Sequence, residues 1–365
     1  MSIKLPEIYQ QSSIPPAVAD SFKQIKNAVQ VEKIGNGLIN ATWKIICTDR
    51  SYILQKINDQ VFKDPYIIEQ NLKKIAEHIR FHYPEYRLPL PVTNRDGNEL
   101  FYEEGSGYFR LFDFLEGSVC NTVVANTKQA FEAAKQFAGF VRRLNSLAAK
   151  ELGNPIADFH DLDLRYHQFE TIVATANSNR LTAAADLIDF LRDHSNIVVQ
   201  YKQLVESGSM ILRPMHHDTK ISNVLFDEQD QGLAVIDLDT VMPGYFISDL
   251  GDMIRTYTCT VNEEETDFGK ITVRQDFFEA IVKGYLSEMK DILTEQEKNL
   301  LVYAGEFMIY MQCLRFATDY LENDKYYGAR YTDHNLNRAL NQMKLLKELI
   351  KARPVFDNIV KMAFN

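Results

Sequence analysis

The most informative segment of the sequence reads His217-Asp218-Thr219-Lys220-Ile221-Ser222-Asn223, and it is followed by Val235-Ile236-Asp237-Leu238-Asp239. An Asp and an Asn stand five residues apart in the first part, and in the second part an Asp leaves a short apolar run. This layout is typical of kinase-type phosphoryl transfer, in which the protein mainly positions the reactants and neutralises charge. The segment therefore predicts a phosphoryl-transfer site.

The polar residues of this segment have separate expected roles. Asp218 is predicted to accept the hydrogen bond, and then the proton, of an acceptor hydroxyl. Asn223 and Asp237 are predicted to hold Mg²⁺, a hard ion that takes a few protein oxygens and completes its shell with phosphates and water. Because side chains two apart on a strand share a face, Asp237 and Asp239 are both expected to face the cleft.

Each residue of the segment also has a simpler interpretation. Single Asp and Asn residues in turns commonly bond nearby backbone, and the neighbours His216 and His217 suggest a metal site. Adjacent side chains on an extended segment point to opposite sides, however, so one ion cannot easily use both histidines. The complete spacing beside two apolar runs is much rarer by chance, and it favours the kinase interpretation.

Length and composition narrow the remaining possibilities. The chain has 365 residues, with 40 Lys plus Arg against 50 Asp plus Glu, and a formal net charge of −10. Single hydrophobic cores stop growing at roughly 250–300 residues, so two lobes are expected. The acidic balance and the lack of a basic cluster in the sequence argue against a nucleic-acid partner.

The sequence carries no signal for a membrane or an oxidising compartment. It has no run of about 18 apolar residues, so we expect neither a signal peptide nor a membrane helix. The cysteines are far apart and form no CxxC pair, which argues against a disulfide framework or a zinc site. We expect a cytoplasmic protein without a membrane partner. The sequence leaves the oligomeric state open, and a monomer is compatible with it.

The first third of the chain has a strand-rich pattern. A polar helix is expected over 16–29, and apolar positions at helical spacing predict a second helix over 64–81. Runs of apolar, β-branched and aromatic residues, separated by turn residues, predict strands over 41–48, 51–57, 99–103 and 107–115. This part therefore predicts a small sheet that carries one inserted helix.

The rest of the chain is mostly helical in pattern. Helices are expected over 127–149, 181–205, 277–292, 294 to about 321 and 335–351, with short strands over 211–216, 224–226 and 234–236. Thr294 and Glu297 form a capping-box pattern. The sequence thus predicts an α+β fold with an N-terminal lobe over 1–116, built on a small antiparallel sheet with one helix, and a larger, mostly helical lobe over 117–365.

Several stretches are similar to known families. The segments 217–223 and 236–240 resemble the aminoglycoside phosphotransferase and choline kinase superfamily. A narrower resemblance, to the N-acetylhexosamine 1-kinases, is carried by Gly35-Asn36-Gly37-Leu38-Ile39-Asn40, Tyr52-Ile53-Leu54-Gln55, Asp237-Leu238-Asp239-Thr240-Val241-Met242-Pro243-Gly244 and Arg315-Phe316-Ala317-Thr318-Asp319-Tyr320-Leu321-Glu322, with His334-Asn335-Leu336 after it.

The resemblance extends from about residue 31 to 347, most of the chain. It implies a two-lobed protein-kinase-like fold with ATP as co-substrate and Mg²⁺ as cofactor. The narrower match implies transfer of the γ-phosphoryl group to the anomeric 1-hydroxyl of a sugar acceptor, N-acetylglucosamine or N-acetylgalactosamine.

The glycines before the first strong strand suggest how phosphates are covered. Gly35 and Gly37, in the segment that ends at Asn40, would let backbone amides approach phosphates closely. Two glycines before a strand also commonly form only a turn. Together with the downstream motif, they are predicted to bind the nucleotide.

The resemblance also indicates which residue would stand at the phosphate-binding cation position and where the hinge between the lobes would lie. Kinases of this kind usually carry a phosphate-binding Lys on the next strand, but the matching position here holds Gln55, as it does in the similar sugar kinases. Lys56 would point to the other face of the strand. Either Gln55 donates to the phosphates as a neutral group, or another residue supplies the charge. The hinge would fall at 113–117, with backbone groups of Asp113 and Leu115 bonding adenine.

The acceptor side is predicted from a later helix. Arg315 and Asp319 are four residues apart and lie on one helix face, which by resemblance would meet the sugar. An ordinary ion pair between them is an equal alternative. Asp249 matches a superfamily Asp that braces the catalytic loop, so it is expected to be structural. The run 263–265 of three Glu residues would suit a cationic substrate, but a solvated loop is favoured.

Three functions remain open at this point. The first is an N-acetylhexosamine 1-kinase that uses MgATP. The second is a kinase of the same fold for another alcohol, such as an aminoglycoside, choline, methylthioribose or homoserine. The third is a nucleotide-binding pseudokinase, which is disfavoured because a protein that only binds nucleotide has no need of Asp218.

Overall fold

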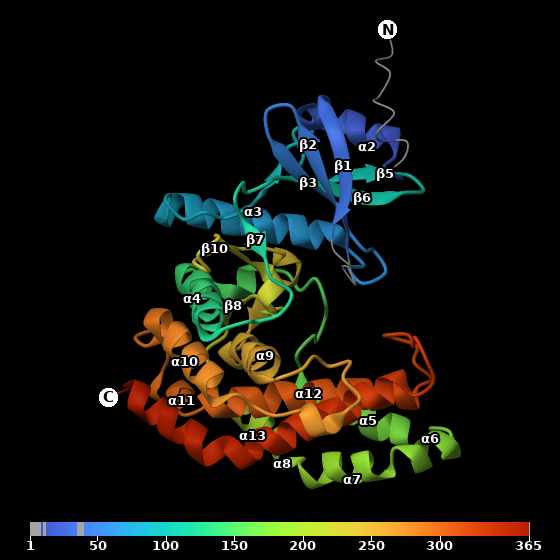
Figure 1. The fold of residues 1–365 in the computed structure, drawn as a ribbon, viewed down its shortest axis with the longest axis vertical. Coiled ribbons are helices and arrows are strands. Elements are labelled where there is room, and N and C mark those ends of the chain that lie inside the picture. Colours follow the sequence, from blue (N-terminus) through green and yellow to red (C-terminus); the bar gives the residue numbers. More distant parts are fainter. Residues whose placement is uncertain (1–8, 10–11, 35–39, 365) are drawn as a thin grey trace.

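The computed structural model describes residues 9, 12–34 and 40–364, and it has two lobes stacked along the long axis of the molecule (Figure 1). The N-lobe extends from α2 to β6 and contains a six-stranded sheet. The C-lobe extends from β7 to α13 and is mostly helical. This arrangement confirms the predicted α+β, kinase-like fold.

The N-lobe sheet is antiparallel, with the strand order β1-β2-β3-β6-β4 and with β5 paired to β6. Alternation in β2 buries Trp43, Ile45 and Cys47 on the inner face. The helix α3 begins after Asp64, whose side chain accepts the Tyr66 N–H and caps it. The elements are α2 (Pro16–Ser21), β1 (Ala28–Ile34), β2 (Ala41–Cys47), β3 (Ser51–Lys56), α3 (Pro65–His82), β4 (Pro91–Val92), β5 (Phe101–Glu103) and β6 (Gly107–Asp113).

The expected helix over 16–29 was wrong in its second half. Helix α2 ends at Ser21 because Phe22 is extended, with φ −107° and ψ 112°. A short 3₁₀ turn follows at Lys23–Ile25, and β1 then begins at Ala28. Strand β1 pairs with β2 from the Ala28–Cys47 pair to the Ile34–Thr42 pair. Pairing with a neighbouring strand overrides the weak helical pattern of this polar segment.

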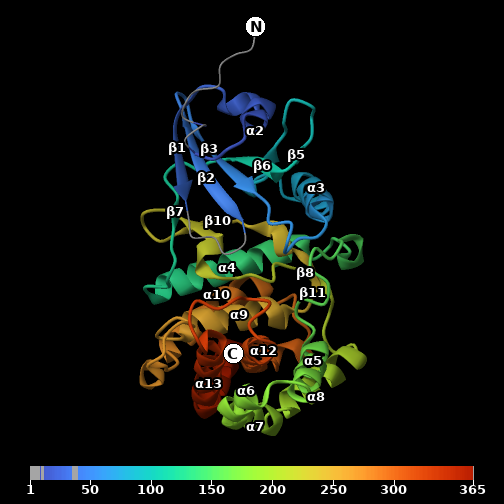
Figure 2. The ribbon, with the colours of Figure 1, turned by 90° about the vertical axis from the view of Figure 1, so that its right-hand side faces the viewer.

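The C-lobe begins at β7, which pairs with β9, so the proposed boundary between 116 and 117 falls between β6 and β7. Figure 2 shows its short strands directly beneath the N-lobe and its helices stacked below them. The elements are β7 (Val119–Cys120), α4 (Thr127–Leu144), α5 (Leu162–Val173), α6 (Ser178–Ala183), α7 (Ala185–Asp193), α8 (Asn196–Glu206), β8 (Arg213–Met215), β9 (Val224–Phe226), β10 (Gly232–Val235), β11 (Met242–Gly244), α9 (Phe246–Thr258), α10 (Gln275–Met289), α11 (Glu295–Lys298), α12 (Leu301–Leu321) and α13 (His334–Phe364).

The C-lobe core forms where helices cross closely. A Cβ atom on Gly251 of α9 would lie 2.2 Å from the Ala304 carbonyl oxygen of α12. A Cβ atom on Gly284 of α10 would lie equally close, 2.2 Å, to the Phe131 carbonyl oxygen of α4. Only glycine permits backbones to approach to this distance. The first crossing holds α9, and with it the residues described below, against α12, and the second holds α10 against α4.

Four predicted helices of the C-lobe differ clearly from the structure, and the first of them, expected over 127–149, ends at Leu144. The expected helix over 181–205 is divided into α6, α7 and α8, and α5 was not predicted. The capping box of Thr294 and Glu297 is present, but α11 stops at Lys298 and α12 starts at Leu301. Glu297 also forms a buried ion pair with Arg213, 2.6 Å apart, which fixes this short helix by tertiary contact. Helix α13 continues past the expected end at 351 to Phe364.

Among the residues that the structure describes, no helix is both long and apolar enough to cross a membrane.

Candidate active site

The loop between β8 and β9 carries Asp218, and it is held from α9 by one carboxylate. The Asp249 carboxylate accepts the backbone N–H groups of His216 and His217, at 2.9 and 2.8 Å. The Asp249 carbonyl oxygen accepts the Thr219 hydroxyl at 2.8 Å. Burial raises the pKa of Asp249 to about 7, against the lowering effect of those two N–H donors. Asp249 therefore braces the loop, and this is the structural role that the sequence suggested for it.

The two histidines before Asp218 pack into the lobe on different sides. His216 lies against Phe137, with ring centroids 5.0 Å apart, and its Nε2 contacts the Ile236 carbonyl oxygen at 3.0 Å. His217 faces His160, with ring centroids 5.2 Å apart. Burial lowers the pKa of each to about 4, so both are neutral at physiological pH. Their separate environments fit packing roles.

Asp218 is half-buried and is held by two donors. Its Oδ2 accepts from the Lys220 ammonium at 2.7 Å and from the Asn223 amide at 3.0 Å. Burial alone would raise the pKa of Asp218, but the Lys220 charge and these hydrogen bonds outweigh it and lower the pKa below its ordinary value. Asp218 is thus ionised and able to accept a hydrogen bond from a hydroxyl. Lys220 was not predicted as a site residue, although it stands only two residues after Asp218 in the sequence.

Two oxygen groups lie beside Asp218 without a partner in the described part of the chain. The Asn223 side-chain Nδ2 donates to the Asp218 backbone carbonyl and carboxylate oxygens, which leaves the Asn223 side-chain Oδ1 available. The Asp237 residue has φ 61°, a left-handed conformation, and no described donor contacts its carboxylate. Burial and the nearby Asp239 charge raise the pKa of Asp237 to about 7.

This donor set fits Mg²⁺. Asn223 and Asp237 would hold the ion with hard oxygen atoms, and the remaining positions would be left for phosphates and water. The described residues contain no group of three or more His, Cys, Asp or Glu side chains placed for a metal. When bound, the ion would supply positive charge opposite phosphate oxygens.

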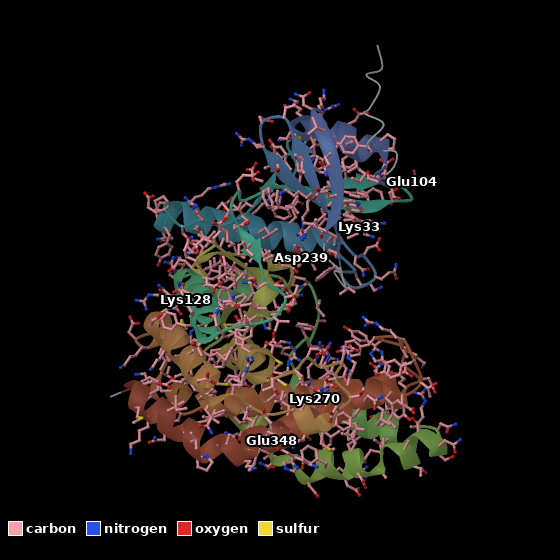
Figure 3. All side chains as sticks on the ribbon, viewed as in Figure 1. Lys33, Glu104, Lys128, Asp239, Lys270 and Glu348 are labelled. Atoms are coloured by element: carbon pink, nitrogen blue, oxygen red, sulfur yellow. The ribbon has the colours of Figure 1, made fainter. Side chains whose placement is uncertain are left out.

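The expectation that Asp237 and Asp239 share one face of a strand was wrong. Leu238–Thr240 form a 3₁₀ turn instead, because Asp237 in its left-handed conformation ends the extended run. Asp239 points to the N-lobe, where it forms an ion pair with Arg110 at 2.6 Å and accepts the Asn40 amide at 2.8 Å. Figure 3 shows Asp239 at the level where the two lobes meet. The contact therefore joins the lobes.

Arg110 was not predicted, and it clarifies the position of Gln55. The two residues are cross-strand partners in the β3–β6 pair. The Gln55 carbonyl oxygen accepts from two nitrogens of Arg110, at 3.2 and 2.9 Å. Gln55 thus orients a buried cation whose charge is already paired with Asp239, and the contact of Gln55 with the phosphates stays a prediction. The pairing follows from the register of β3 and β6. The sequence alone does not give that register, because it is set only in the folded sheet.

Of the other residues predicted to bind the nucleotide, the structure describes only some. Gly35 and Gly37 lie outside the described residues. The Asn40 carbonyl oxygen accepts the Asn58 N–H at 3.0 Å, which fixes its amide toward Asp239. Asp113 ends β6, paired with Tyr52, and the Leu115 carbonyl oxygen accepts the Ser118 N–H at 3.1 Å. Their contacts with adenine stay predictions.

The sequence matches the phosphotransferase enzyme family (APH) over residues 30–280, more than half of the chain. The chain belongs to this family. Similar folds are seen in an aminoglycoside phosphotransferase from Alicyclobacillus acidocaldarius (14% identity, 94% of this chain and 97% of that chain covered, TM-score 0.65) and in a microcompartment-associated aminopropanol kinase (15%, 94% and 99%, 0.62). A spectinomycin phosphotransferase in complex with ADP and spectinomycin is also similar (14%, 97% and 97%, 0.58).

The acceptor residues predicted in this phosphotransferase do not contact each other. The Asp319 carboxylate accepts the N–H groups of Tyr326 and Tyr327 at 2.7 and 3.0 Å, and the Asn335 amide at 3.0 Å. Arg315 instead donates to the Gln312 side chain at 3.0 Å. The structure therefore has no ion pair between Arg315 and Asp319, which was the other interpretation of these two residues. Asp319 attaches the loop after α12 to the end of that helix. The predicted contact of Asp319 with a sugar stays a prediction.

The three glutamates at 263–265 are held by ion pairs, which differs from the expected solvated loop. Glu263 contacts Arg255 at 3.0 Å and also pairs with Arg338. Glu264 contacts His334 at 2.6 Å, and Glu265 contacts Lys270 at 3.4 Å. Because these charges are already paired, the run is not available as a cation-binding surface.

The inter-lobe ion pair leads to a testable expectation for stability. The Arg110 and Asp239 side chains are 3% and 2% exposed, so Arg110→Met leaves a buried carboxylate without its counter-charge. We expect it to lower the free energy of unfolding by about 3 kcal/mol, measured by urea denaturation.

The exposed pair of Arg142 and Asp291 provides a matched control. Their side chains are 37% and 68% exposed, so Arg142→Met should cost less than about 1 kcal/mol. The double variant Arg110→Met/Asp239→Leu should recover much of the loss, because no unpaired charge then remains. Equal losses in Arg110→Met and Arg142→Met would contradict the role given to the buried pair.

Proposed function

We propose that this phosphotransferase transfers the γ-phosphoryl group of ATP to the anomeric 1-hydroxyl of an N-acetylhexosamine. The observation that carries the reaction type is the cluster of Asp218, Asn223 and Asp237. An ionised carboxylate stands beside two oxygen groups that suit Mg²⁺. In this arrangement Asp218 accepts the proton of the acceptor hydroxyl while the metal and the N-lobe position the nucleotide.

The choice of a sugar rests on the stretches that resemble N-acetylhexosamine 1-kinases, and the charges of the C-lobe support it over a cationic acceptor. Choline or an aminoglycoside would need unpaired carboxylates in the acceptor region. Asp319 is occupied by three donors, and Glu263 and Glu264 are paired with basic groups. We therefore favour a neutral or anionic acceptor.

A panel of acceptors tests the proposed function directly. With MgATP, N-acetylglucosamine or N-acetylgalactosamine should yield ADP and a sugar 1-phosphate, detected by coupled ADP release and by ³¹P NMR. Choline, an aminoglycoside, methylthioribose and homoserine serve as matched alcohols and should react at least about 10-fold more slowly in kcat/KM. Turnover of one of those alcohols without turnover of the N-acetylhexosamines would replace this proposal with the same-fold alternative. ATP binding without any turnover would favour the pseudokinase.

A further inference from the structure

A cavity of about 520 Å³ lies in the C-lobe between α5, the C-terminal half of α12 and the loop that follows α12. In Figure 1, α5 and this loop lie at the same end of α12. Its wall includes two arginines from different helices, Arg165 and Arg315, and two aromatic residues of the loop, Tyr326 and Tyr327. The cavity therefore combines positive charge with flat apolar surface.

The Arg315 guanidinium is held mainly by aromatic rings. It lies 5.2 Å from the ring centre of Phe159, 5.8 Å from that of Tyr326 and 5.5 Å from that of Tyr327. Its one hydrogen bond within the described chain goes to the Gln312 side chain. A guanidinium carries five N–H donors, so most of its donors remain available to a ligand.

Arg165 is fixed by neutral groups. It donates to the Gln168 side chain at 3.0 Å and to the Asp158 carbonyl oxygen at 2.9 Å. Its Nε is buried and has no partner among the described residues. Burial lowers the pKa of Arg165, and the positive charge of Arg315 lowers it further. The two arginines thus repel each other across the same cavity.

Neither arginine is ion-paired with a carboxylate in the part of the chain that the structure describes. This contrasts with the most buried arginines elsewhere, which each contact an acidic side chain: Arg110, Arg213, Arg255 and Arg338. The carboxylates that line the cavity are occupied, Asp319 by backbone and amide donors and Glu322 by Lys325 at 3.2 Å. Asp158 is exposed and contacts Arg165 through its backbone. Neither guanidinium therefore has a described carboxylate within ion-pair distance, although Asp319 and Glu322 line the same cavity.

The cavity is connected to the catalytic loop by stacked rings. Phe159, which contacts Arg315, stacks on His160 with centroids 4.4 Å apart. His160 in turn lies 5.2 Å from the ring of His217, the residue before Asp218. Burial and the nearby positive charges of His217, Arg315 and Arg165 lower the pKa of His160, so it adds no charge of its own. Phe159 and His160 thus lie between Arg315 of the cavity and the loop that carries Asp218.

We propose that Arg165 and Arg315 bind an anionic substituent of the acceptor, so that the preferred substrate is an N-acetylhexosamine bearing a carboxylate, sulfate or phosphate away from its anomeric hydroxyl. The planar guanidinium matches each of these groups through paired N–H donors. This inference rests on the proposed function and narrows its substrate class. It adds no new chemical step, because the γ-phosphoryl transfer is the same.

The test compares matched acceptors. N-acetylglucosamine, its 6-sulfate, its 6-phosphate and N-acetylmuramic acid, which carries a carboxylate, are assayed with MgATP at constant ionic strength. At least one anionic sugar should exceed neutral N-acetylglucosamine in kcat/KM by about 10-fold or more, as expected for hydrogen bonds to a charged group. The sugar with the highest kcat/KM identifies which anionic group the cavity accepts.

Two variants assign the effect to the arginines. In Arg315→Gln and Arg165→Gln the ratio of kcat/KM for the best anionic sugar to that for the neutral sugar should fall toward 1. Arg274→Gln is the matched control, because Arg274 also lies over an aromatic ring, that of Phe277, and bonds backbone carbonyls outside the cavity. Its ratio should equal that of the unaltered protein, whatever happens to stability.

The outcomes separate the two proposals. Turnover of the neutral sugar with no gain for any anionic sugar would overturn the anionic subsite and leave the proposed function standing. If no sugar is phosphorylated, the proposed function fails, and calorimetric titration decides the subsite on its own. Tighter binding of an anionic sugar than of the neutral one, lost in Arg315→Gln, supports the subsite. Equal or absent binding of all four sugars overturns it as well.

Discussion

Asp218→Asn should lower kcat by about 10³-fold while it leaves the affinity for MgATP nearly unchanged. The substitution keeps the size of the side chain and one oxygen for the donors Lys220 and Asn223, but an amide cannot take the proton of the acceptor hydroxyl. General bases typically contribute 10²–10⁴-fold. Single-turnover assays measure the chemical step, and calorimetric titration with MgATP measures binding.

Asp227→Asn is the control for this experiment. Asp227 lies between β9 and β10 and also accepts N–H groups, from Gln229 and Gln231 at 2.9 and 2.8 Å. Its substitution tests the general effect of removing a negative charge from a C-lobe loop, and kcat should change by less than about 2-fold. Unchanged turnover in Asp218→Asn would remove this residue from the role of base.

Asp237→Ala should weaken MgATP binding and lower kcat/KM for MgATP by about 10³-fold. The variant deletes a carboxylate that would contact the ion, and a metal ion supplies several kcal/mol of charge stabilisation at a phosphoryl group. Calorimetric titration with MgATP measures the loss of affinity, and titration with Mn²⁺ at fixed ATP shows whether the metal is the ligand affected.

The left-handed backbone at Asp237 calls for its own control, since Ala adopts this conformation less readily than Asp. Asp230 has the same φ of 61° and lies in the β9–β10 turn. Asp230→Ala therefore repeats the backbone cost and also removes the hydrogen bonds from Asn126 and Gln129. It should lower the unfolding temperature with no change in MgATP affinity. Equal MgATP affinities in Asp237→Ala and Asp230→Ala would exclude the metal role.

The parts of the fold that sequence predicted well are those that local pattern determines. Strands β2 and β3 are apolar, β-branched runs on either side of a tight turn, and the structure has them within one residue of the expected ends. Helix α4 shows a strong apolar stripe, and its start at Thr127 matches as well. The spacing from Asp218 to Asn223 indicates the site because five residues just form the short loop that brings the two side chains together.

Features that depend on tertiary pairing were not predictable. The Arg110–Asp239 contact joins two elements from different lobes, and nothing in either local sequence indicates the partner. The left-handed φ of Asp237 ends the extended run, so Asp239 lies in a 3₁₀ turn and contacts the N-lobe. The strand-like sequence pattern does not reveal that turn. Arg315 and Asp319 share a helix face, yet they form no ion pair. The loop after α12 supplies backbone N–H donors to the Asp319 carboxylate instead. In each case a distant segment decided the contact.

The tyrosine-bearing loop and the loop that carries Asp218 are attached to different helices. Asp319 anchors that loop by its backbone amides, whereas the loop with Asp218 hangs from α9 by a different acid, Asp249. Under the proposed function, replacements between 322 and 333 would alter the cavity that Tyr326 and Tyr327 line, while the loop with Asp218 would keep its own attachment to α9.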